Sequence, residues 1–184
     1  MAKRIMIIRH GEKPSKKDSI KGISLSGFRS KNELSARGWQ RSGALIRFFN
    51  PIMGDVFSDP ALRKPDVILA EDPKGHIKSQ RPLHTIESLA ISLRKKPVLR
   101  YTKGQEQRLV EFAKAQPGVV LICWEHSAII DIANLLLGDS EACPQHWPGD
   151  RFDLVWIFEA RQKSWKFSQV PQLLLPGDRP TTIK

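Results

Sequence analysis

Short runs of consecutive apolar residues, separated by amphipathic stretches, are the feature that most constrains the fold of this chain. Residues 119–123 read Val-Val-Leu-Ile-Cys, and residues 5–8 read Ile-Met-Ile-Ile, without a polar side chain in either run. Such runs are typical of strands in a sheet that is covered on both faces. They are too short to cross a bilayer or to form the core of a signal peptide.

The pattern as a whole predicts six strands and four helices. The expected strands are residues 5–8, 66–70, 98–101, 119–123, 152–158 and 165–170. The expected helices are a segment capped by Ser35 and ended by Pro51, then residues 79–95, 105–115 and 127–137. Alternation of the two predicts an α/β fold, a three-layer α/β/α sandwich with a mostly parallel central sheet. The short link between the last two strands predicts a hairpin, and hence one antiparallel strand. We expect residues 1–184 to form a single domain.

The positive charge of the chain is concentrated at one end. The net charge is +11, and residues 1–47 carry +9 of it. Such a surface attracts a phosphorylated molecule, nucleic acid or an acidic membrane face, unless it is simply solvated. The tryptophans do not alternate with basic residues as a nucleic-acid stacking surface would, so nucleic acid is disfavoured. We expect no membrane partner, and the two cysteines, too few for a disulfide framework, predict a cytoplasmic location.

Two histidines follow expected strands at the edge where ligands bind in open α/β sheets. His10 comes after the first strand, and His126 comes after the most apolar one. Arg9 precedes His10, and Arg81 begins an expected helix. Two imidazoles and two guanidiniums suit a phosphoryl group, because arginine binds phosphate oxygens as a fork and neutral histidine is a nucleophile.

Four short blocks occur in order along the chain. They are Ile7-Ile8-Arg9-His10-Gly11-Glu12, Leu34-Ser35-Ala36-Arg37-Gly38, Arg81-Pro82-Leu83-His84-Thr85-Ile86-Glu87 and Glu125-His126-Ser127. Together they resemble the signature of the histidine phosphatase superfamily, whose fold is phosphoglycerate mutase-like. A lone Arg-His-Gly would be weak, whereas four ordered blocks in the expected strand and helix contexts are specific.

The resemblance implies that His10 is a nucleophile that becomes phosphohistidine. It implies that Arg9, Arg81 and His126 hold the phosphoryl oxygens, without a metal or a cofactor. Further contacts with the substrate are expected from Gly11, Lys13 and Ser127. Outside this set, His84 is interpreted as structural, and His76 and His146 as loop residues.

The general acid that protonates the leaving group stays open at this point. Glu125 is the first candidate, because it is adjacent to His126. Glu125 can act only if the backbone has left strand geometry there, since consecutive strand residues face opposite sides. Glu106 is the second candidate. Glu12 is the third, and is better suited to hold the loop of His10.

The predicted function is hydrolysis of a phosphomonoester, or of a protein phosphohistidine, through a phosphohistidine intermediate. The partner would be a small anionic phosphorylated substrate or a phosphoprotein. A short interval between the second and third blocks favours hydrolysis over phosphomutase action. A phosphate-recognition module with weak or no turnover is the alternative, and nucleic-acid binding ranks third. The substrate, the oligomeric state and the role of the basic loop at residues 12–34 stay open.

Overall fold

A computed structural model of the chain describes residues 1–52, 56–74 and 78–184. Within these ranges there are five strands and four helices. In chain order they are β1 (Ala2–Arg9), α1 (Ala36–Phe49), β2 (Val67–Ala70), α2 (Arg81–Ser92), α3 (Glu106–Ala115), β3 (Gly118–Trp124), α4 (His126–Leu137), β4 (Leu154–Ala160) and β5 (Trp165–Pro171). His76, which was expected in a loop, lies outside the described residues.

The five strands form one sheet in the order β2-β3-β1-β4-β5. β3 pairs in parallel with both β1 and β2, whereas β4 pairs antiparallel with both β1 and β5. The sheet is therefore mixed, and the expectation of a mostly parallel sheet is corrected. The expected hairpin is present as β4 and β5.

The path of the chain after α4 explains why β4 is reversed. α4 returns the chain from the carboxyl end of β3, and residues 138–153 lead back to that end of the sheet. There the side chain of Arg9, the last residue of β1, donates to the backbone carbonyls of Gly149 and Arg151. β4 consequently enters the sheet from the carboxyl end of β1 and runs against it.

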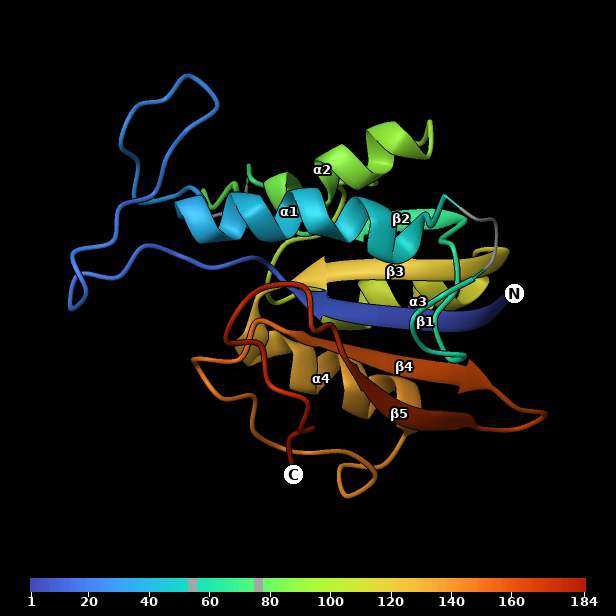
Figure 1. Cartoon of the computed structure of the whole chain (residues 1–184). Helices are drawn as coiled ribbons and strands as arrows, with labels where there is room; N and C mark the ends of the chain where they lie inside the picture. The colour runs from blue at the N-terminus through green and yellow to red at the C-terminus, as the bar shows by residue number, and fades with distance from the viewer. Residues whose placement is uncertain (53–55, 75–77) are drawn as a thin grey trace.

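Helices cover both faces of the sheet, as expected for three layers. α1 and α2 lie on one face, and α3 and α4 lie on the other (Figure 1). β1 shows why its sequence is continuously apolar: Ile5 and Ile7 belong to the core under α3 and α4, whereas Met6 and Ile8 belong to the core under α1 and α2. Successive strand side chains point to opposite faces, and here both faces are buried.

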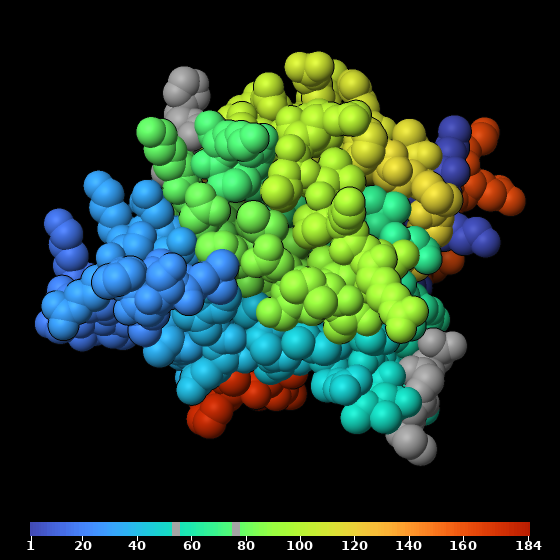
Figure 2. Space-filling model, turned by 90° about the horizontal axis from the view of Figure 1, so that it is seen from above, coloured from blue at the N-terminus to red at the C-terminus, as the bar shows by residue number. Residues whose placement is uncertain are grey.

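Residues 11–34 connect β1 to α1 and project beyond the carboxyl ends of β1 and β3 (Figure 1). In a view from above the helices, the same segment stands out from the body of the molecule (Figure 2). Isolated bridges join Ser15 to Ile20 and Ile23 to Arg29, so this long connection has local order of its own.

Local signals placed most elements correctly. Ser35 accepts a hydrogen bond from Gly38 N and caps α1, and α1 ends just before Pro51, at Asn50. The strand expected at residues 98–101 is wrong, because only Val98 bridges to β2. β2 has four residues, and just beyond it the backbone N–H of Asp72 donates to the carbonyl of Tyr101 at 2.9 Å.

His84 has a structural environment, as interpreted. Its Nδ1 lies 2.6 Å from Glu33 Oε2, and its ring stacks on Trp39 with centroids 5.2 Å apart. In the part of the chain that the structure describes, no helix is both long and apolar enough to cross a membrane. The same residues contain no group of three or more His, Cys, Asp or Glu side chains placed to hold a metal ion.

Candidate active site

The carboxyl ends of β2, β3 and β1 bring three chain segments together. Arg9 is paired in register with Trp124, and the backbone N–H of His10 donates to the Trp124 carbonyl at 3.2 Å. The backbone of His10 therefore lies beside the Glu125-His126 segment, although Glu125 comes 115 residues later in the chain. Glu71, the residue after β2, continues the same edge, with its N–H directed to the Cys123 carbonyl at 3.4 Å.

His10 is held as a neutral ring with a defined tautomer. It is 2% exposed, and its Nδ1 lies 2.7 Å from the carbonyl oxygen of Gly11. A carbonyl only accepts, so Nδ1 carries the proton and Nε2 keeps its lone pair. Burial lowers the pKa of His10 to about 3, and the charge of Arg9 adds to this effect. The ring is consequently neutral, with Nε2 available as a nucleophile, throughout the neutral range.

Gly11 fixes the backbone that follows His10 against two helices. Its N–H donates to Thr85 Oγ1 at 2.7 Å, and that hydroxyl donates to the carbonyl of Arg81 at 2.7 Å. A Cβ on Gly11 would lie 3.0 Å from the carbonyl oxygen of Gly38, and a Cβ on Gly38 would lie 2.5 Å from that of Glu12. The first, second and third sequence blocks thus meet at this point.

Arg9 is a buried guanidinium with donors to spare. Its Nη1 donates to backbone carbonyls, including that of Gly149 at 2.9 Å, and its Cζ lies 3.8 Å from the ring centroid of Phe152. Its Nε and Nη2 are buried and have no hydrogen-bond partner among the described residues. Burial lowers the pKa of Arg9 to about 10, so it stays charged. Unpaired buried donors are costly, and an anion would satisfy them.

Arg81, the first residue of α2, has a similar environment. Its Nη1 donates to the carbonyl of Lys31 at 3.0 Å, and its buried Nε has no partner within the described ranges. Burial lowers the pKa of Arg81, and the charge of Glu71 opposes that shift. The positive charge of Arg81 also lowers the pKa of His10 and of Arg9, after burial as the main cause. The two guanidiniums therefore lie close enough to His10 for the positive charge of each to lower its pKa.

Glu125 stands where β3 ends and α4 begins, and it is held as a carboxylate. It caps α4 by accepting from Ser127 N at 3.1 Å, and it also accepts from Lys103 Nζ at 3.1 Å. His126 Nδ1 lies 2.5 Å from Glu125 Oε1. Burial raises the pKa of Glu125, but the hydrogen bonds from His126, Ser127 and Lys103 outweigh it and leave the pKa well below its ordinary value. This carboxylate orients His126, and it is poorly suited to give up a proton.

The other two acid candidates are engaged in structural contacts. Glu106 accepts from the backbone of Gly104 at 2.9 Å and from Trp124 Nε1 at 3.2 Å. Glu12 pairs with Arg41 at 2.8 Å and with Arg37 at 3.0 Å. Glu12 therefore holds the loop of His10, which is the role that its sequence position favours.

Ser127 and Lys13, the other two residues expected to contact the substrate, lie in different surroundings. Ser127 is in the first turn of α4, where its hydroxyl bonds to Glu125 and accepts from Lys103 Nζ at 2.6 Å. Lys13 is exposed and lines a large cavity that also includes Phe152, whose ring lies 6.2 Å from the ring of His10.

Glu71 is a site residue that the sequence reasoning missed. Glu71 is 6% exposed, and this burial raises its pKa above the ordinary value. The charge of Glu125 adds to the shift, whereas Lys103 opposes it. The signal was available, because Glu71 directly follows an expected strand in the same way as the two histidines. Histidine at a strand end indicates catalysis more directly than a carboxylate does, so Glu71 is not among the residues that the sequence predicts for the site.

Comparison with solved structures gives the class of this fold. The chain superimposes on a mycobacterial glucosyl-3-phosphoglycerate phosphatase with a TM-score of 0.56 at 13% identity, covering 92% of this chain and 97% of that one. A phosphoserine phosphatase from Entamoeba histolytica, in complex with 3-phosphoglyceric acid, gives 0.56 at 14% identity, covering 91% and 95%. A candidate α-ribazole-5′-phosphate phosphatase from Escherichia coli gives 0.55 at 16%, covering 93% and 97%.

These similarities support the resemblance at the level of the fold: the chain shares the fold of these phosphatases over more than nine tenths of its length. Its sequence matches no protein-family model and no curated protein.

Proposed function

We propose that this protein hydrolyses a phosphomonoester through a phosphohistidine formed on His10. The observation that carries the proposal is the set of buried guanidinium donors without a partner, on Arg9 and Arg81, beside a neutral histidine whose Nδ1 is occupied. A tetrahedral dianion placed there would accept from both arginines while its phosphorus faces Nε2 of His10. Phosphoryl transfer depends mainly on such positioning and on fixed positive charge.

The reaction would proceed in two displacements. The lone pair of His10 Nε2 forms a bond to phosphorus, and the ester P–O bond breaks, with the electron pair leaving on the ester oxygen. That oxygen takes a proton to become an alcohol. A water molecule then attacks phosphorus, the N–P bond breaks, and inorganic phosphate and neutral His10 are released. Arg9, Arg81 and His126 are the groups we assign to the phosphoryl oxygens.

We assign the proton of the leaving alcohol to Glu71 in place of Glu125. Support for this comes from the two opposite environments: burial raises the pKa of Glu71, whereas the hydrogen bonds to Glu125 lower its pKa. A buried carboxyl whose pKa is raised holds its proton more readily, so it is better suited to donate, and it can take a proton from the attacking water in the second step.

The similar phosphatases support a proposal for the class of substrate, without naming one compound. Two of the structurally similar phosphatases are named for glucosyl-3-phosphoglycerate and phosphoserine. A phosphorylated small molecule is accordingly the substrate we propose here, with a phosphoprotein as the second possibility. A recognition module that binds phosphate without turnover is the competing function, and it is favoured by the occupied, ionised state of Glu125.

The test replaces His10 with alanine and measures phosphate release from p-nitrophenyl phosphate. Loss of the nucleophile should lower kcat by about 10³-fold or more, and a chelator should leave the native activity unchanged. His146→Ala is the matched control, because His146 is an exposed loop histidine. Full activity in His10→Ala would remove the proposal. Phosphate binding by the native chain, without turnover of any phosphate ester, would favour the recognition module.

A further inference from the structure

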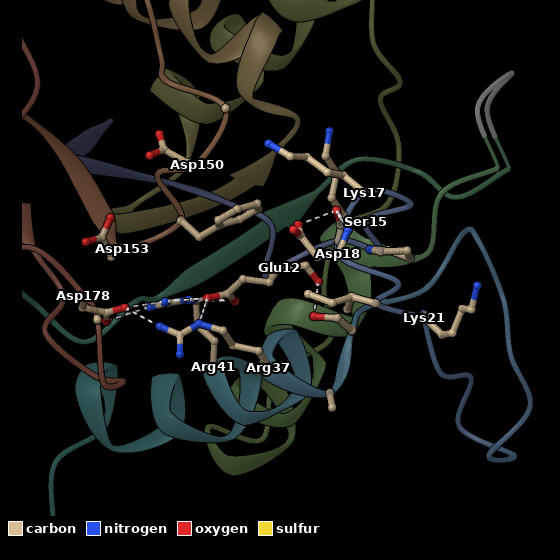
Figure 3. Close-up of a pocket in the computed structure, with 18 of the residues that line it drawn as sticks. Glu12, Ser15, Lys17, Asp18, Lys21, Arg37, Arg41, Asp150, Asp153 and Asp178 are labelled. Atoms are coloured by element: carbon tan, nitrogen blue, oxygen red, sulfur yellow. Dashed lines mark hydrogen bonds and ion pairs between the residues drawn. The ribbon is translucent and has the colours of Figure 1, made fainter.

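A cavity near His10, lined in part by Phe152, is not explained by the chemistry above. Its volume is about 1260 Å³, and its walls come from the start of the 11–34 segment, the first turns of α1, residues 149–153 and residues 176–179 (Figure 3). A single phosphoryl group needs only a small part of this space, whereas pockets for small organic ligands have volumes of roughly 300–1,000 Å³.

The cavity begins where the phosphate pocket ends. Phe152 lines the cavity, and its ring lies 6.2 Å from the ring of His10 and against the guanidinium of Arg9. Gly149 also lines the cavity, and its carbonyl accepts from Arg9. A phosphate ester held by Arg9 and His10 would therefore extend its alcohol part past Phe152 into this space.

Most charges in the cavity wall neutralise one another. Arg41 pairs with Glu12 at 2.8 Å and with Asp178 at 2.7 Å. Arg179 pairs with Asp150 at 2.9 Å. Two further wall residues take part in the same kind of contact, since Arg37 joins Glu12 and Asp153 binds Arg151.

Four lysines are the exception. They are Lys13, Lys16, Lys17 and Lys21, all exposed and all in the wall. None has an ion-pair partner among the residues that the structure describes. Only one wall carboxylate lies among them, Asp18, and it accepts from the hydroxyl of Ser15. Uncompensated charge of one sign along a concave surface concentrates counter-ions there.

We propose that this cavity binds the non-reacting part of the substrate and that this part carries a second anionic group. The substrate would then be a small molecule with a second phosphate or a carboxylate besides the phosphate that is cleaved. This inference rests on the proposed function. It gives the basic segment a role that the charge pattern alone left open between substrate selection and solvation.

The experiment compares fructose 1,6-bisphosphate with fructose 6-phosphate, which share a carbon skeleton and differ by one phosphate. The native chain should give the larger kcat/KM with the bisphosphate, and added salt should reduce the preference. In the triple variant Lys16→Gln, Lys17→Gln, Lys21→Gln, the ratio of the two kcat/KM values should fall by about two- to fivefold for each lysine removed.

The matched control removes the same charge elsewhere. Lys3, Lys163 and Lys166 are exposed and belong to the opposite end of the sheet and its β4–β5 hairpin (Figure 1). The triple variant Lys3→Gln, Lys163→Gln, Lys166→Gln should keep the native ratio. An equal fall in both triple variants would mean that net charge alone acts, and would overturn the assignment of the cavity.

The outcomes separate this inference from the proposed function. Hydrolysis of p-nitrophenyl phosphate with no preference for the bisphosphate, or turnover of phosphopeptides alone, would overturn the cavity assignment and keep a hydrolase. If no ester is hydrolysed, calorimetric titration with the same two sugars decides the matter. Tighter binding of the bisphosphate that weakens in the lysine triple variant would keep the assignment, and equal binding would overturn it.

Discussion

At the scale of single residues, two carboxylates that flank one site have opposite protonation behaviour. Glu125 accepts from Lys103 and from Ser127 and contacts His126, so its charged form is stabilised. Glu71 is buried beside that negative charge, so its neutral form is favoured. Their sequence contexts are alike, because each follows a strand. Hydrogen-bond donors around Glu125, and burial around Glu71, separate the carboxylate that contacts His126 from the carboxyl that we propose as the proton donor.

Replacement of Glu71 by glutamine should act according to the leaving group. For an alkyl phosphate, whose alkoxide needs a proton, kcat should fall by about 10²- to 10⁴-fold. For p-nitrophenyl phosphate the loss should be much smaller, because nitrophenolate leaves without a proton. Steady-state kinetics with both substrates makes the comparison. Glu125→Gln should impair both substrates alike, since it disturbs the position of His126; equal losses in Glu71→Gln would contradict the role assigned to Glu71.

The neutral state of His10 should also appear in the pH dependence of stability. The folded chain binds this proton only near pH 3, whereas an unfolded histidine binds it near its reference pKa of about 6.5. Protons therefore favour the unfolded state, and stability from this group is lost as the pH falls below about 6.5. The loss at pH 5 should be about 2 kcal/mol.

Urea unfolding at pH 7 and pH 5 measures this contribution. The free energy of unfolding of His10→Asn should fall less between the two pH values than that of the native chain. Other acidic groups shift both proteins equally, so the difference isolates His10. An identical fall in both would show that His10 is readily protonated in the folded state.

At the scale of elements, α1 carries two glycines with opposite roles. Gly38 in its first turn is crossed by the loop that follows His10, whereas a Cβ on Gly43 would meet nothing within 4 Å. Glycine is therefore required for packing at position 38, whereas at position 43 it only lowers the stability of the helix. The close approach at Gly38 is what presses the His10 loop onto α1.

Alanine at each position should move stability in opposite directions. Gly43→Ala should stabilise the protein by about 0.5–1 kcal/mol, through helix propensity alone. Gly38→Ala should destabilise it and lower phosphatase activity, because the new methyl group would lie 2.5 Å from the Glu12 carbonyl oxygen. Chemical denaturation measures both. Stabilisation by Gly38→Ala would mean that the loop is free to move away from α1.

At the scale of the whole molecule, one buried cation joins segments from the two ends of the chain. The side chain of Arg41 is 1% exposed and pairs with Glu12 from the His10 loop and with Asp178 from the C-terminal segment. Asp178 is likewise only 3% exposed. This group forms the floor of the cavity and fixes the His10 loop relative to the end of the chain (Figure 3).

Removal of Arg41 should therefore be costly. Arg41→Met removes the buried cation from Glu12 and Asp178, which then keep only the partly exposed Arg37, and it should lower the free energy of unfolding by about 3–5 kcal/mol. Arg37→Met is the control, because Arg37 pairs with the same carboxylates but its side chain is 41% exposed. Its cost should be below about 1 kcal/mol. Similar costs in denaturant titrations of the two variants would contradict this account.

The sequence by itself determined the local features of this protein. Apolar runs located β1 and β3, Ser35 and Pro51 bounded α1, and histidines at strand ends indicated a phosphate site, because each of these signals depends on neighbours in the chain. The strand expected at residues 98–101 is wrong, because Val98 alone in that segment makes a bridge to β2.

Only the tertiary structure decided which charges are compensated. The pKa values of Glu71 and Glu125, the mixed direction of the sheet and the unpaired lysines of the cavity all depend on residues that are distant in the chain. Burial and ion pairing are properties of the packed molecule, and no sequence interval encodes them. For that reason the pattern of residues was enough to propose His10 as the nucleophile, whereas the proposals for the proton donor and for the second anionic group required the fold.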